Sequence, residues 1–239
     1  MIYLYTGTPG SGKSLHSARD IYQKLKNGGN VIANFPVNVE KIKNLKGEFY
    51  YIDNADITVD FFIRFADKYH EMGKENQTLV ILDECSVLFN PRDFQRSDRS
   101  VWLSFFAQHR KYGFNFILVS QMDRQIDRQI RGCVEVEVKH RKANNYKMFW
   151  ILPFPLFLAI DTWYAGGGGD NKLNSFFFLY RKKYGADFYN SFMLFDGRLK
   201  VKNTEKIDKL IKEGRLTNGG DSDGGDPLTA AQNLKEQTI

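Results

Sequence analysis

Cysteine and histidine are scarce in this chain. Its 239 residues include two cysteines, Cys85 and Cys133, and four histidines. Two cysteines are too few for the disulfide framework of a secreted scaffold, and the sequence has no His-Glu-x-x-His motif or Cys/His cluster of the kind that binds zinc. We therefore expect neither a disulfide-stabilised protein nor a zinc enzyme, and we expect a reducing, cytoplasmic location.

Long hydrophobic runs are also missing. The most apolar stretch, residues 149–160, has twelve residues including two prolines, whereas a membrane-spanning helix needs about 20. The N-terminus carries no signal-peptide pattern. We expect no spanning segment, and we expect the apolar stretch to form a buried or edge strand followed by a loop. The alternative is a peripheral contact of residues 149–164, with Trp150 and Trp163, at the cytoplasmic face of a membrane.

Neither sign of charge dominates. Lysine and arginine total 34 and aspartate and glutamate 28, which gives a formal net charge of +6 and a pI near 9.1. This excess is compatible with nucleic acid or an anionic membrane surface and selects neither. Hydrophobic residues make up 42% of the chain, which argues against global disorder and allows one α/β domain with an appendage.

One motif predicts most of the chemistry. Residues 7–14 read Gly-Thr-Pro-Gly-Ser-Gly-Lys-Ser, a complete P-loop between a strand-like run and a helix-compatible stretch. The glycines let backbone N–H groups approach phosphate oxygens, and the following helix points its N-terminal N–H groups at the same place. Lys13 can reach the β- and γ-phosphates, and Ser14 offers a hydroxyl to Mg²⁺. We expect nucleotide contacts from Gly7, Thr8, Pro9, Gly10, Ser11, Gly12, Lys13, Ser14 and Leu15.

A second run ends in two acids. Residues 78–84 read Thr-Leu-Val-Ile-Leu-Asp-Glu, a pattern typical of a strand buried on both faces of a parallel sheet. The acids then lie at a strand tip, where open α/β sheets bind ligands. We assign Asp83 to hold Mg²⁺ and Glu84 to polarise the attacking water, an arrangement that favours hydrolysis. The sequence has no Asn-Lys-x-Asp guanine motif, so we expect ATP.

Strand and helix patterns alternate through the first 120 residues. Strands are predicted at residues 2–6, 31–33, 49–52, 79–82 and 116–120, and helices at 13–26, 59–71 and 100–112. This order predicts a mostly parallel sheet with helices on both faces. Residues 134–138 then alternate with period two and 146–150 are strand-like, so we expect an antiparallel edge hairpin that turns at Asn144 and Asn145.

We divide the chain into a P-loop core with its edge hairpin at residues 1–150, a C-terminal appendage at 151–216 and a disordered tail at 217–239. Within the appendage, the four glycines 166–169 predict a flexible loop, 175–180 an aromatic strand and 204–213 a short amphipathic helix.

Gln121 and Arg110 are further candidates for catalysis. Gln121 follows the strand predicted at 116–120, and that strand tip suits a sensor of the γ-phosphate. Arg110 ends the preceding helix. We choose it first as an arginine finger lent to a neighbouring subunit, ahead of Arg92, while Arg96 and Arg99 lie in the same arginine-rich region.

A third arginine group follows. If residues 123–131 form one helix, then Arg124, Arg128 and Arg131 share a face that excludes the aspartates before them. Contact with a phosphate backbone, contact with another subunit and simple exposure to solvent are equally compatible with this pattern.

Taken in order, these motifs resemble the ATPase domain of the zonula occludens toxin (Zot) family, which includes the assembly ATPases of filamentous phages. The resemblance covers about residues 1–150 and rests on residues 1–14, 79–84, 108–113, 119–121 and 125–131. It implies a RecA-like core related to the HerA/FtsK motors, working as a homo-oligomeric ring with ATP and Mg²⁺. It also implies that hydrolysis drives virion assembly and export of single-stranded DNA, together with phage or membrane assembly proteins.

Two other functions stay open. A DNA-packaging or conjugative DNA translocase on the same fold would show strong stimulation of ATP hydrolysis by DNA. A nucleotide-switched, membrane-associated assembly factor with slow turnover would instead show nucleotide-dependent partner binding and little hydrolysis.

Overall fold

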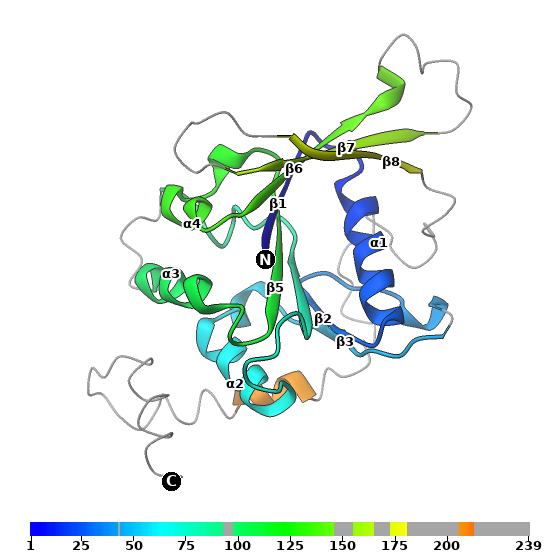
Figure 1. Cartoon of the computed structure of the whole chain (residues 1–239). Helices are drawn as coiled ribbons and strands as arrows, with labels where there is room; N and C mark the ends of the chain where they lie inside the picture. The colour runs from blue at the N-terminus through cyan, green and yellow to red at the C-terminus, as the bar shows by residue number, and fades with distance from the viewer. Residues whose placement is uncertain (43, 93–97, 146–154, 165–172, 181–205, 213–239) are drawn as a thin grey trace.

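A computed structural model describes residues 1–42, 44–92, 98–145, 155–164, 173–180 and 206–212. These residues form one eight-stranded sheet in the order β3-β2-β4-β5-β1-β6-β7-β8 (Figure 1). The strands are β1 (Ile2–Thr6), β2 (Asn30–Ala33), β3 (Phe49–Tyr51), β4 (Thr78–Leu82), β5 (Phe114–Val119), β6 (Val136–Lys142), β7 (Leu156–Trp163) and β8 (Leu173–Tyr180). The α-helices are α1 (Lys13–Lys26), α2 (Val59–Tyr69), α3 (Arg99–Gln108) and α4 (Arg128–Gly132), and short 3₁₀ turns include η3 (Asp123–Gln125) and η4 (Ala143–Asn145).

The first six strands are parallel to one another. β1 lies between β5 and β6, and β4 lies between β2 and β5. All five residues of β4 are buried, as the continuous apolar run predicts. The predicted α/β fold, with a mostly parallel sheet and antiparallel edge strands, is confirmed.

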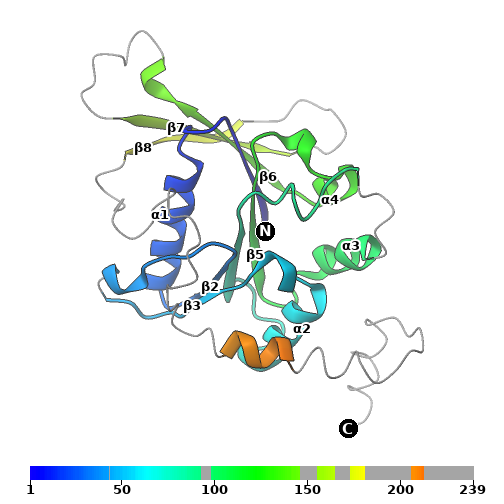
Figure 2. The ribbon, with the colours of Figure 1, turned by 180° about the vertical axis from the view of Figure 1, so that it is seen from behind.

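Helices cover both faces of the parallel part. α1 lies on one face, and α2, α3 and α4 lie on the other (Figures 1 and 2). On the α1 face, Ile21 and Leu25 pack with buried strand residues such as Ile81. On the opposite face the core is aromatic, and Phe62 is fully buried with its ring stacked on Phe105 at 5.7 Å between centroids. Both layers therefore bury the apolar strand faces that a parallel sheet cannot expose.

The antiparallel end of the sheet consists of β7 and β8. The predicted edge exists, but the predicted pairing is wrong. β6 starts at Val136, two residues later than predicted, and its antiparallel partner is β7 rather than residues 146–150, which lie outside the described residues. The prediction chose the nearest strand-like run, whereas the chain first turns through η4, where Asn144 Oδ1 accepts a hydrogen bond from the Leu156 backbone N–H at 2.7 Å.

The region beyond residue 150 is partly described. The aromatic strand predicted at 175–180 lies within β8, which pairs with β7 in the same sheet as the P-loop strand. Residues 206–212 are helical, and Ile207 and Leu210 pack into the aromatic core (orange in Figure 1). The glycine run and the tail fall outside the described residues, and the division at residues 150 and 216 stays a prediction.

The single helix predicted at residues 123–131 is wrong. η3 ends at Gln125, Ile126 is extended, Asp127 is not helical, and α4 starts only at Arg128. The Asp127 side chain accepts hydrogen bonds from the Gln129 and Ile130 backbone N–H groups, so it caps α4 and separates it from η3. The three arginines consequently share no helical face.

No helix among the described residues is both long and apolar enough to cross a bilayer.

Candidate nucleotide-binding and catalytic site

The P-loop leaves β1 at Thr6 and enters α1 at Lys13. Its three glycines have positive φ angles: 144° at Gly7, 74° at Gly10 and 100° at Gly12, conformations that other residues rarely adopt. The N-cap residue of α1 is Gly12, which has no side chain to cap the helix, and the first turn of α1 holds no acid. The N-terminal N–H groups and the positive end of the helix dipole therefore suit an anion.

Lys13 bends back over this loop. Its Nζ donates to the backbone oxygens of Gly7 at 2.6 Å and Thr8 at 3.2 Å. Partial burial lowers the pKa of Lys13, and the nearby carboxylates of Asp83 and Glu84 raise it. The ammonium thus lies on the P-loop backbone and is close enough to the two acids to feel their charge, at the place where the motif binds phosphates.

The two acids follow β4 directly, at the same carboxyl edge of the sheet. Asp83 Oδ1 accepts a hydrogen bond from the Glu84 backbone N–H at 2.9 Å. Burial raises the pKa of Asp83, while that hydrogen bond and Lys13 lower it. Glu84 has a φ of 48°, an uncommon conformation for a residue with a side chain and one that often marks functional sites. Its side chain is exposed.

Asn34 was not found by sequence reasoning, although it fixes this acidic turn. It follows β2, and its amide forms a two-way clamp with the backbone of Asp83. Nδ2 donates to the Asp83 carbonyl oxygen at 2.8 Å, and Oδ1 accepts from the Asp83 N–H at 2.7 Å. A polar residue at the tip of the neighbouring parallel strand was the only available signal.

Gln121 lies beside the P-loop, as its position predicts. Its backbone oxygen accepts a hydrogen bond from the Gly7 N–H at 3.2 Å, and the neighbouring Ser120 N–H donates to the Tyr5 oxygen at 2.9 Å. The side chain of Gln121 is exposed. The structure thus brings Lys13, Asp83, Glu84 and Gln121 to one edge, while the sensor role of Gln121 stays a prediction.

A cavity of about 530 Å³ opens next to the P-loop. One wall is Gly7 and Thr8, a second is the segment 121–124, and the third is the end of β6, residues 139–142 with Glu137. This volume is in the range of small-molecule sites.

A buried histidine pair lies behind the P-loop. His140 on β6 places Nδ1 3.1 Å from the Thr6 oxygen and Nε2 2.8 Å from His16 Nδ1 on α1. His16 in turn lies 3.2 Å from the Tyr5 hydroxyl. Burial lowers the pKa of His140 to about 4 and lowers that of His16, so both are neutral at pH 7. This network joins the P-loop strand, the P-loop helix and β6.

Arg110 is not brought to this edge. It precedes β5, at the amino edge of the sheet, and forms an ion pair with Glu135, just before β6. It therefore lies at the opposite edge from the P-loop of its own chain. The second choice, Arg92, is exposed in the loop after β4, and Arg96 lies outside the described residues.

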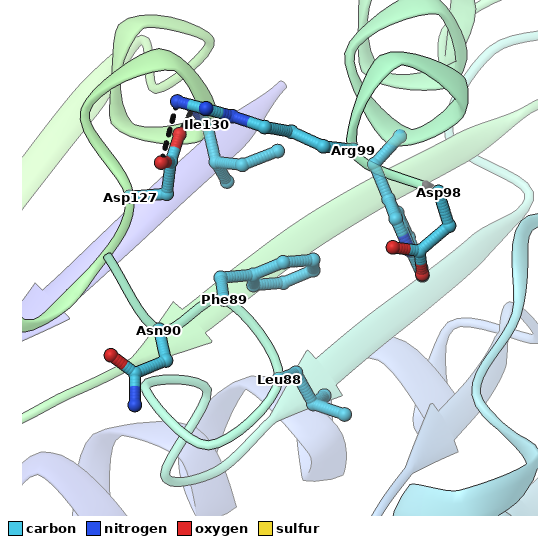
Figure 3. Close-up of a pocket in the computed structure, with 8 residues that line it drawn as sticks. Leu88, Phe89, Asn90, Asp98, Arg99, Asp127 and Ile130 are labelled. Atoms are coloured by element: carbon cyan, nitrogen blue, oxygen red, sulfur yellow. Dashed lines mark hydrogen bonds and ion pairs between the residues drawn. The ribbon is translucent and has the colours of Figure 1, made fainter. Parts of the chain in front are cut away.

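The remaining arginines have separate surroundings. Arg131 Nη1 lies 3.4 Å from Asp123 Oδ2, which contradicts the prediction that this arginine avoids the aspartates. Arg99 Nη2 lies 2.7 Å from Asp127 Oδ2, at a small pocket between α3, α4 and the loop after β4 (Figure 3). That pocket holds about 20 Å³, room for about one water molecule, so it is no nucleotide site.

The P-loop residues fit a nucleotide with its metal ion. A Cβ on Gly7 would lie 2.5 Å from the His140 backbone oxygen, and one on Gly12 would lie 2.7 Å from the Phe157 ring, so both positions require glycine. The buried Ser11 Oγ has no hydrogen-bond partner among the residues that the structure describes. Ser14 at the start of α1 and Asp83 would offer the hard oxygen ligands that Mg²⁺ prefers.

The fold and this edge define a P-loop nucleoside triphosphatase. The sequence profile of the zonular occludens toxin (Zot) family matches residues 1–152, and the chain belongs to that family. The Gene 1 protein of Enterobacteria phage M13 is 28% identical over 145 residues, covering 57% of this chain and 40% of the relative. The chain therefore matches less than half the length of this curated relative.

A solved structure agrees on the fold. A DnaB-like replicative helicase, solved for its interactions with primase, superposes with a TM-score of 0.52 at 14% identity, covering 76% of this chain and 56% of the helicase. The N-terminal domain of zonular occludens toxin from Neisseria meningitidis superposes with a TM-score of 0.49 at 17% identity, covering 79% and 98%. At such identities the likeness to the helicase concerns the fold alone, and membership of the Zot family rests on the sequence profile.

Proposed function

We propose that this protein hydrolyses ATP to drive virion assembly and export of single-stranded phage DNA. The observation that carries the proposal is the meeting of Lys13, Asp83 and Glu84 at one sheet edge in a chain of the Zot family. The family resemblance supplies the biological process, and the two acids after β4 supply the preference for hydrolysis over phosphoryl transfer to a second substrate.

The residues of this chain have separate tasks in that reaction. The P-loop N–H groups and Lys13 bind and orient the phosphates, and Ser14 and Asp83 hold Mg²⁺, which supplies charge neutralisation when bound. Glu84 orients the attacking water, and the clamp from Asn34 keeps the acidic turn in place. Gln121 senses the γ-phosphate. Catalysis is then mostly positioning and charge stabilisation, as in phosphoryl transfer generally.

The active protein is a homo-oligomeric ring at the cytoplasmic face of the host membrane, working with phage or membrane assembly proteins. In such a ring Arg110 acts in trans. Its place at the amino edge excludes it from the P-loop of its own chain and leaves its half-exposed guanidinium accessible to a neighbour. Arg110→Ala should then lower turnover, and unchanged turnover would end this assignment.

The test is ATP hydrolysis by the purified protein with no DNA, with single-stranded DNA and with duplex DNA. Lys13→Ala and Glu84→Gln should each lower turnover by about 100-fold or more, because each removes a group that acts on the transition state. Glu84→Gln should keep nucleotide binding, which separates the two roles. Strong nucleotide binding with negligible turnover and no DNA effect would contradict the proposal and favour a nucleotide-switched assembly factor.

A further inference from the structure

Within the described part of the chain, the two faces of the antiparallel end of the sheet are buried to different extents. On the α1 face, Val138, Ala159 and Leu179 are buried, and Phe177 packs edge-on against His16 with ring centroids 4.9 Å apart. Side chains alternate along a strand, so the residues next to these in sequence point away from α1. Among these outward-pointing residues, Phe176 and Phe178 belong to neither hydrophobic core and are 63% and 45% exposed.

The strand register arranges these outward residues in two rows. In one row Lys139 pairs with Ile160 and Ile160 with Phe176, and in the other Arg141 pairs with Leu158 and Leu158 with Phe178. We call the six residues the aromatic–basic face. Each row has an exposed basic side chain on β6, an aliphatic residue on β7 and an exposed phenyl ring on β8. The charge and the ring of a row are two strand spacings apart, about 10 Å.

The basic side of this face opens into the cavity next to the P-loop. Lys139 and Arg141 line that cavity together with the exposed Arg124 and with Gly7. Both acids that line it are paired: Glu137 is buried, accepts a hydrogen bond from the Thr6 hydroxyl at 2.9 Å and lies 3.3 Å from Lys139 Nζ, and Asp123 pairs with Arg131. Four basic residues, Arg124, Lys139, Arg141 and Lys142, line the cavity against these two acids, so the net charge of its lining is positive.

We infer that the aromatic–basic face binds a single strand of nucleic acid. An unpaired strand carries phosphates on one side and flat bases on the other. Basic residues match the phosphates, and exposed rings accept stacked bases, which is how proteins hold single strands without reading their sequence. The inference deepens the proposed function, on which it rests for the choice of DNA over RNA.

An anionic membrane surface is the competing occupant, since rings and bases also suit a lipid interface. The position of the cavity next to the P-loop favours a nucleic-acid strand over a membrane surface. The basic residues of the face, Lys139 and Arg141, line the same cavity as Gly7 and the segment after β5, which lie next to the expected nucleotide. A translocated polymer needs that proximity, and a membrane anchor does not. The rings are also both phenylalanine, while membrane interfaces favour tryptophan and tyrosine.

The experiment measures binding of a fluorescent oligothymidylate to the full chain by anisotropy. The Phe176→Ala/Phe178→Ala double variant should weaken binding about tenfold or more, because each stacked base contributes substantially to affinity. Arg141→Gln should lower the slope of log affinity against log salt by about 0.7, the amount expected for one lost phosphate contact on a single strand. Duplex DNA should bind more weakly and should not respond to the double variant.

Met72→Ala and Lys111→Ala are matched controls. Both side chains are exposed, and both lie in the turns that precede β4 and β5, at the opposite edge of the sheet. Wild-type affinity in these controls, with unchanged thermal melting in all variants, would support the assignment. Oligothymidylate binding that survives in the double variant would overturn it, as would a loss confined to binding of phosphatidylserine vesicles.

ATP hydrolysis by the same preparations separates the two proposals. If the protein hydrolyses ATP and the double variant binds DNA as well as the wild type does, the proposed function stands and the aromatic–basic face is not the DNA-binding site. If the protein does not hydrolyse ATP but its DNA binding is lost in the double variant, the DNA-binding site stands and the proposed function is rejected.

Discussion

The parallel part of the sheet and its antiparallel end differ in how they are covered. The parallel strands are enclosed between α1 and the layer of α2, α3 and α4 (Figures 1 and 2), whereas among the described residues β7 and β8 pack into a hydrophobic core on the α1 face only. The carboxyl edge of the first region gathers the P-loop and both acids, while the second region exposes phenyl rings. Strands packed between two helical layers suit a site that must hold catalytic groups in place, and the exposed aromatic–basic face suits a partner that binds and dissociates.

The largest contrast should come from removing one phenyl ring in each region. Phe62→Ala should destabilise the protein by about 3–5 kcal/mol, because the ring is fully buried among other aromatic rings. Phe176→Ala should cost less than about 1 kcal/mol, because the ring is mostly exposed. Urea unfolding measures the loss of stability in both variants. A loss in Phe176→Ala as large as that in Phe62→Ala would show that the aromatic–basic face is part of a core.

The buried His16–His140 pair, which lies where the parallel strands meet the antiparallel end, should make the stability of the protein depend on pH. His140 contacts His16 and the Thr6 oxygen, with the positive charges of Lys13 and Arg19 nearby. Burial lowers the pKa of His140 from 6.5 to about 4, so the unfolded chain takes up the proton first as pH falls. Stability is therefore full above about pH 6.5 and declines toward pH 4, by about 3 kcal/mol for this shift.

His140→Gln tests that dependence. Urea unfolding between pH 7.5 and 4.5 should show a shallower loss of stability in the variant than in the wild type. Asp20 and the other carboxyl groups are present in both proteins, so the difference between the slopes reports the histidine. Parallel slopes would contradict the account.

A smaller effect is expected where the covering helical layer ends, at α4. Asp127 caps this helix and pairs with Arg99 in a nearly buried position, so Asp127→Ala should destabilise the fold by about 2 kcal/mol. Asp123→Ala is the matched control. It removes a more exposed partner from Arg131 and should cost less than about 1 kcal/mol. Thermal unfolding of the two variants gives the comparison, and equal losses would mean that burial around Asp127 does not matter.

Local patterns predicted the parts of the fold whose signals are local. The P-loop glycines, the apolar run of β4 and its two acids were readable because each requirement lies within a few residues. The partner of β6 was not, since alternation identifies a strand without saying which strand pairs with it. The break at Asp127 depends on a capping side chain within a stretch of helical appearance. The clamp by Asn34 joins residues 49 positions apart, and only the sheet brings them together.

The measurement that tests the account most directly is the ratio of ATP turnover with oligothymidylate to turnover without it. Because the ratio compares each protein with itself, it measures the coupling between the aromatic–basic face and the nucleotide-binding site. We predict stimulation in the wild type and in Met72→Ala, and none in Phe176→Ala/Phe178→Ala. Stimulation of the double variant equal to that of the wild type would contradict the claim that the two regions of this sheet work together.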